Sequence, residues 1–83
     1  MDNNDTLQWK IEIDKANEVK EIMSSVYKSL KIKGYDPISQ IVGYILSGDP
    51  TYITSYDGAR GKIVKVERDE LLEELVKAYI KNI

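Results

Sequence analysis

Hydrophobic residues recur at helical spacing through most of this 83-residue chain. Between Asp14 and Gly34 the apolar positions fall on one face of a helix. They are Val19, Ile22, Met23, Val26, Tyr27 and Leu30. Charged residues cover the opposite face, Asp14 can cap the start, and Gly34 can end the helix in the left-handed conformation. The pattern predicts a long amphipathic helix between these two residues.

Two short joints follow, and they share one logic. In each, a glycine can take positive φ just past a helix, an aspartate can cap the next helix, and a proline fits its first turn. The joint residues are Gly34, Asp36, Pro37, Gly48, Asp49 and Pro50. They predict a short helix over about residues 37–47, whose apolar face is Ile38, Ile41, Val42, Ile45 and Leu46. Gly43 lies inside this helix, and we expect another backbone to pass close to it.

The C-terminal third is predicted to be helical as well. One or two helical turns are expected after Pro50, with Asp57 as a turn or cap residue. A helix is favoured over residues 58–67, although the β-branched run GKIVKV is also compatible with a strand. The last helix is expected over about residues 69–81. Its apolar set is Leu71, Leu72, Leu75, Val76, Tyr79 and Ile80.

The N-terminus has a different pattern. Residues 1–6 are polar after Met1 and are predicted to form a flexible tail. Residues 7–13 then alternate apolar and polar positions, with Leu7, Trp9, Ile11 and Ile13. A period of two is typical of a half-buried strand, which could pair with a symmetry mate or lie extended across a helix face. The expected fold is therefore mainly α. It is a small bundle of about four to five helices with an extended N-terminal segment, forming one helical domain over residues 7–83.

Composition narrows the possible chemistry. The chain has no cysteine and no histidine, so disulfides, the usual zinc ligands and nucleophile–histidine pairs are all excluded. We expect no catalytic residues, no metal and no cofactor. A domain this small often needs a staple or a partner subunit, and the predicted solution is a two-fold homodimer. No apolar run approaches the length of a membrane span and the acidic start is no signal peptide, so a cytoplasmic protein without membrane insertion is expected.

Two groups of residues are candidates for function. Thr6 lies in the polar tail, where its hydroxyl could reach a kinase. Arg60, Lys62, Lys65 and Arg68 could form a docking surface for an acidic partner or a phosphate, because arginine binds such groups in a bidentate way. The ordinary interpretation is a solvated helix face paired with nearby carboxylates.

A helix-turn-helix that binds nucleic acid is the alternative function. A short helix, a Gly-Asp-Pro turn and a basic helix are compatible with that motif. The net charge of −2 argues against it, as does the lack of Asn or Gln beside the arginines. Nucleic acid is therefore not the expected partner.

Two long stretches, GYDPISQIVGYILSGDPTYITSYDGAR and ERDELLEELVKAYI, resemble the IreB/ReoM family of small Gram-positive regulators. The resemblance covers residues 19–81 and reaches the tail through TLQW. It implies a small helical protein that dimerises and is a cytosolic substrate of a transmembrane PASTA-type Ser/Thr kinase, with a phosphatase that reverses the modification. It further implies control of peptidoglycan synthesis and of β-lactam (cephalosporin) resistance. In one branch this occurs through ClpCP proteolysis of MurA, which phosphorylation relieves.

The resemblance also assigns residues. The family's phosphoacceptor threonine precedes an apolar-x-aromatic triplet, and Thr6 in TLQW matches it. Some members have a second threonine a few residues earlier, where this chain has Asn3. Arginines used by the family after the Gly-Asp-Pro joint match Arg60 and Arg68, while Lys62, Val64 and Lys65 stand where more arginines would be expected.

Overall fold

The computed structural model describes the backbone of residues 3–83 and the side chains of residues 7–83. Its elements are α1 (Asn3–Ile32), α2 (Pro37–Ser47), the 3-10 turns η1 (Pro50–Tyr52) and η2 (Tyr56–Gly58), α3 (Ala59–Ile63) and α4 (Arg68–Lys81). Residues 3–83 contain no strand. The predicted mainly α fold is confirmed, with four α-helices.

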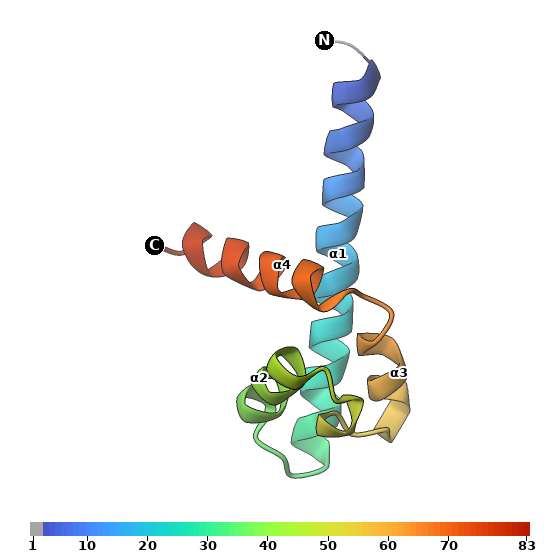
Figure 1. The fold of residues 1–83 in the computed structure, drawn as a ribbon, viewed down its shortest axis with the longest axis vertical. Helices are drawn as coiled ribbons and strands as arrows, with labels where there is room; N and C mark the ends of the chain where they lie inside the picture. Colours follow the sequence, from blue (N-terminus) through green and yellow to red (C-terminus); the bar gives the residue numbers. More distant parts are fainter. Residues whose placement is uncertain (1–2) are drawn as a thin grey trace.

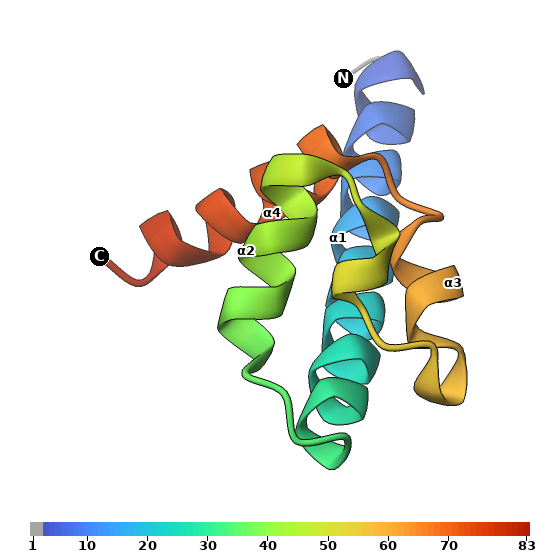
Figure 2. The same ribbon diagram turned by 60° about the horizontal axis from the view of Figure 1, so that its bottom comes forward.

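The core lies against the C-terminal half of α1. Helix α3 packs on one side of that half and α2 on the other, and η1 packs against α2 (Figures 1 and 2). The buried apolar residues from α1 recur at the predicted helical spacing, because they form the stripe that faces the other elements. The full buried apolar set is Val19, Ile22, Val26, Leu30, Ile41, Tyr44, Ile53, Ala59, Ile63, Val66 and Leu71.

Helix α1 is much longer than predicted. It continues without a break from Asn3, so residues 7–13 are helical and the expected extended segment is wrong. Asp14 lies inside the helix and does not cap it. The alternation misled because Leu7 and Ile11 form one line along a helix while Trp9 and Ile13 form another. All four side chains are exposed, by between 39% and 66%. Because this part of the helix has no buried face, its apolar residues do not recur every 3.6 positions.

Residues 3–13 of α1, here called the arm, project beyond the rest of the molecule (Figure 1). The molecule measures 49 × 28 × 22 Å, and its Cα radius of gyration is 14.2 Å. A compact domain of this length would have a radius of gyration of about 12 Å. The arm and the free end of α4 account for the elongation, since both extend away from the core (Figure 1).

The two joints have the geometry that their residue types allow. Gly34 and Gly48 have φ values of +84° and +73°. The Asp36 carboxylate accepts hydrogen bonds from the Ile38 N–H at 3.1 Å and the Ser39 hydroxyl at 2.9 Å. Helix α2 therefore begins and ends where the sequence places it, at Pro37 and Ser47. After the second joint the chain forms a single 3-10 turn, η1.

Two details around these joints differ from expectation. The close neighbour of Gly43 is a side chain and not a backbone: a Cβ built on Gly43 would lie 2.5 Å from Cε1 of the Tyr52 ring. The helix expected over residues 58–67 is shorter, since α3 ends at Ile63 and turns follow. The run GKIVKV forms no strand, and its Ile63 and Val66 are buried in the core.

Candidate phosphorylation and partner-binding sites

Thr6 is the fourth residue of α1 and lies within the arm. The boundary predicted between a tail and a domain at residues 6 and 7 falls inside this helix, while Met1 and Asp2 lie outside the described residues. Directly after Thr6, Leu7 is 58% exposed and Trp9 is 66% exposed. The threonine is thus placed on a part of the helix whose following apolar side chains are open to a protein that binds them.

Three of the four candidate basic residues donate hydrogen bonds inside the fold. Arg60 Nε donates to the Ile53 carbonyl at 2.9 Å, and this contact is partly buried. Lys62 Nζ donates to Ser25 Oγ of α1, also at 2.9 Å. These bonds hold η1, α3 and α1 together, so the two side chains contribute to structure whatever else they bind.

Arg68 has a similar structural role at the other end of the fold. Its Nη1 donates to the Ile45 carbonyl near the end of α2, at 2.9 Å. Its guanidinium lies over Gly48, where a Cβ would come within 2.8 Å of Arg68 Cζ. Arg68 therefore joins the start of α4 to the end of α2, an arrangement that no pattern in the sequence indicates.

The four basic residues do not form one continuous patch. Lys62 and Lys65 line a shallow groove between α1 and α3, together with Glu18 and Glu21. Arg68 lines a different depression, between α2 and α4, beside Glu67 and Asp69. Carboxylates accompany the cations in both places, so neither surface is strongly positive.

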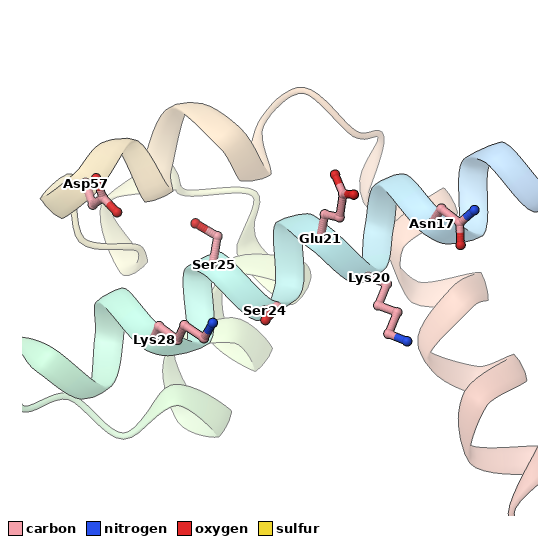
Figure 3. A pocket seen from close by; sticks show the side chains of 7 residues that line it. All are labelled: Asn17, Lys20, Glu21, Ser24, Ser25, Lys28 and Asp57. Carbon is pink, nitrogen blue, oxygen red and sulfur yellow. The ribbon is translucent and has the colours of Figure 1, made fainter.

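A second groove runs along α1 toward η2. Figure 3 shows its lining, with Glu21 and Ser25 of α1 on one side of the helix and Lys20, Ser24 and Lys28 directed the other way. The lysines and the carboxylates, which include Asp57, balance each other. The described residues contain no cluster of three or more side chains that could hold a metal ion.

Exposed apolar side chains gather on α2 and on α4, and we call this set of residues the α2–α4 face. Its α2 residues are Ile38, Val42 and Leu46, and its α4 residues are Leu72, Val76, Tyr79 and Ile80; all are between 47% and 80% exposed. Ile45, the sequence neighbour of Leu46, and Leu72 line the same depression between the end of α2 and the start of α4. The two apolar faces predicted from the sequence are therefore mostly exposed in the single chain, and of their residues only Ile41 and Leu71 are buried.

The joint carboxylate of Asp49 has a lowered pKa. The hydroxyl of Thr51 donates to it at 2.7 Å and the Thr51 N–H at 2.9 Å, and both bonds favour the charged form. A group with a lowered folded-state pKa adds stability above its ordinary pKa of 3.8, and that stability is lost as the pH falls through the folded-state value.

This pKa gives a prediction for acid unfolding. Asp49→Asn keeps a capping oxygen but cannot titrate, so its stability should fall less steeply than that of the wild type below about pH 4. Thr51→Val should raise the pKa of Asp49 toward its ordinary value and give an intermediate slope. Urea midpoints measured across the acid range test this. Parallel curves for the wild type and Asp49→Asn would show that the carboxylate adds no pH-dependent stability.

No helix of the described residues is both long enough and apolar enough to cross a membrane; α1 has the length but carries many charges. The molecule is thus a small helical protein whose polar grooves balance their charges and whose apolar surface is left open, a combination typical of proteins that act by binding others. The model of the IreB regulatory phosphoprotein family matches residues 4–81. The chain belongs to this family.

Curated relatives agree with this assignment. A UPF0297 protein from Acetivibrio thermocellus is 60% identical over 82 residues, which are 99% of this chain and 91% of that protein. Another UPF0297 protein, from Ruminiclostridium cellulolyticum, is 58% identical over 79 residues, covering 95% and 90% of the two chains. The resemblance inferred from the sequence is confirmed, and the family's description as a regulatory phosphoprotein implies a regulatory role rather than catalysis.

Proposed function

We propose that this chain is a non-enzymatic regulator of peptidoglycan synthesis that is switched by phosphorylation of Thr6. The observation that carries the proposal is the match of residues 4–81 to a family of regulatory phosphoproteins. A transmembrane PASTA-type Ser/Thr kinase adds the phosphate on the cytoplasmic side, and a phosphatase removes it. The unphosphorylated protein lowers β-lactam resistance by promoting ClpCP-dependent turnover of MurA.

Thr6 is the best placed of the three threonines in the chain. Thr51 Oγ1 donates to the Asp49 carboxylate, and Thr54 Oγ1 accepts the Tyr56 N–H at 3.2 Å. Both of these hydroxyls are therefore occupied in the tightly turned loop between α2 and α3. Thr6, in contrast, lies near the N-terminal end of α1, where the side chains of residues 7–13 are all exposed. Such a helix end unwinds at low free-energy cost. A kinase can then bind the segment in extended form.

Partner binding is proposed to use the unphosphorylated arm together with the basic residues after the second joint. Lys65 is exposed, and a partner can approach it without breaking a hydrogen bond of the fold. Arg60 and Arg68 are proposed to contribute through the donors that their carbonyl bonds leave free. A phosphate adds about −1.5 to −2 charges at pH 7 and would compete with an acidic partner for these cations.

The alternative helix-turn-helix function gains no support. Helix α3, in the place of a reading helix, has five residues, and two of its cations donate hydrogen bonds to Ile53 and Ser25. A reading helix needs side chains that extend into the major groove. We therefore propose no nucleic-acid ligand.

The proposed function is tested in cells that lack the native gene and express variants of this chain. With Thr6→Ala, MurA should stay low and cephalosporin resistance should be weak, because the active form cannot be switched off. With Thr6→Glu, a partial mimic of the phosphate, MurA should accumulate as it does without the protein. Immunoblots of MurA after a translation block, in strains with and without ClpC, give the readout. Equal MurA half-lives in all strains would contradict the role assigned to this chain.

A further inference from the structure

A groove between α1 and α4 has an apolar floor and a basic rim, and no described element of the chain fills it. Ala16, Val19 and Met23 line it from α1, and Leu75 and Ala78 line it from α4. We call it the α1–α4 groove. The two alanines leave room for larger side chains to enter.

Lysines surround this floor. Lys20 of α1 and Lys77 and Lys81 of α4 line the groove, against a single carboxylate, Glu74. Lys77 pairs with Glu73 at 3.2 Å and with Glu74 at 3.6 Å. Within the part of the chain whose side chains are described, Lys20 and Lys81 form no ion pair. The groove therefore suits an apolar segment that carries negative charge.

The arm has this character. Its exposed side chains include Leu7, Trp9 and Ile11, and its charged residues are Asp5, Lys10 and Glu12, which give it a net negative charge. The arm cannot enter the groove of its own chain while α1 is intact. Leu7 is nine residues from Ala16, a distance of about 14 Å along the helix axis, and the helix itself is one wall of the groove.

We propose that the arm of one copy lies in the α1–α4 groove of a second copy. This inference rests on the proposed function together with the two-fold homodimer that the sequence predicts. Helix α4 extends away from the core (Figure 1). A second copy that packs on the α2–α4 face can therefore also reach around α4 to the α1–α4 groove. Two-fold symmetry makes the exchange reciprocal and covers both arms.

Disulfide trapping tests the exchange, and the chain has no native cysteine to interfere. Leu7→Cys in one chain and Ala78→Cys in a second, tagged chain are mixed and oxidised at micromolar concentration. Docked cysteines meet at an effective concentration on the order of millimolar, so the mixed disulfide should form at least about tenfold faster than in an undocked pair. The matched control pairs Leu7→Cys with Lys31→Cys, on the exposed far end of α1.

Charge reversal and a cis control complete the test. Lys20→Glu with Lys81→Glu should slow the mixed disulfide to the control rate, and Asp5→Lys in the arm should restore part of it. A rate equal to the control in the unaltered pair would overturn the exchange. A disulfide that closes within single chains carrying both cysteines would also overturn it, by assigning the arm to its own groove.

Sedimentation of the same proteins in reducing buffer separates this inference from the dimer itself. A dimer without the mixed disulfide would reject the arm exchange alone. A monomer would reject both the exchange and the homodimer predicted from the sequence.

Discussion

Replacing Gly48 with alanine should destabilise the protein by more than the same replacement at Gly34, although both glycines have positive φ. At Gly34 a Cβ has no neighbour within 4 Å, so the cost is that of a left-handed backbone, about 1–2 kcal/mol. At Gly48 the same Cβ would lie 2.8 Å from Arg68 Cζ. The guanidinium must move, and its bond to the Ile45 carbonyl is lost or weakened.

The extra cost at Gly48 should be about 1 kcal/mol. This is less than the full contribution of a hydrogen bond from a charged donor, because Arg68 is exposed to solvent. For a domain of this size, each kcal/mol shifts the melting temperature by about 4–8 °C. A double-mutant cycle isolates the contact: in an Arg68→Ala background, Gly48→Ala should cost only as much as Gly34→Ala. Equal costs at the two glycines in the wild-type background would show that a Cβ at position 48 does not disturb the hydrogen bond from Arg68 to the Ile45 carbonyl.

Introducing charge into the α2–α4 face should turn a homodimer into a monomer. Leu46 is 80% exposed and Val76 is 51% exposed in the single chain, so replacing both with glutamate should leave the core intact. In a dimer that covers them, each change removes apolar burial of about 1.5–3 kcal/mol and places a charge in a dry interface. Two-fold symmetry doubles the effect. The dissociation constant should rise by at least about 1,000-fold, since each 1.4 kcal/mol is a factor of ten.

Sedimentation equilibrium measures this change directly. The wild type should be a dimer at tens of micromolar, and the double variant a monomer with unchanged helical circular dichroism. Val64→Glu is the matched control. Val64 is 50% exposed, about as much as Val76, but it lies outside the α2–α4 face. A wild type that remains monomeric, or a double variant that remains dimeric, would show that this face is not the interface.

The sequence predicts those parts of the fold that local chemistry determines. Gly34, Asp36 and Pro37 act through neighbouring backbone groups, and so do their counterparts at the second joint. The bounds of α2 could therefore be placed to the residue. The stripe from Val19 to Leu30 is equally local, since its 3.6-residue period reports a single buried face.

The remaining features depend on contacts between distant residues. The period-two alternation of residues 7–13 fits a strand, but it fits an exposed helix as well. The choice between the two depends on whether another part of the fold packs against this segment. Leu46 and Val76 look like core residues because a face that binds a partner has the same apolar pattern as one that binds its own chain. The bond from Arg68 to the Ile45 carbonyl spans 23 positions, so no spacing rule could reveal that this candidate binding arginine also holds the fold together.

Mapping the phosphate added by the cognate kinase tests the central claim most directly. The purified kinase domain is incubated with the full chain, and the product is analysed by intact mass and by peptide sequencing in the mass spectrometer. We expect one phosphate, located on Thr6, that is absent from Thr6→Ala and present in Thr51→Ala and Thr54→Ala. Phosphate on Thr51 or Thr54 with Thr6 unmodified would contradict it.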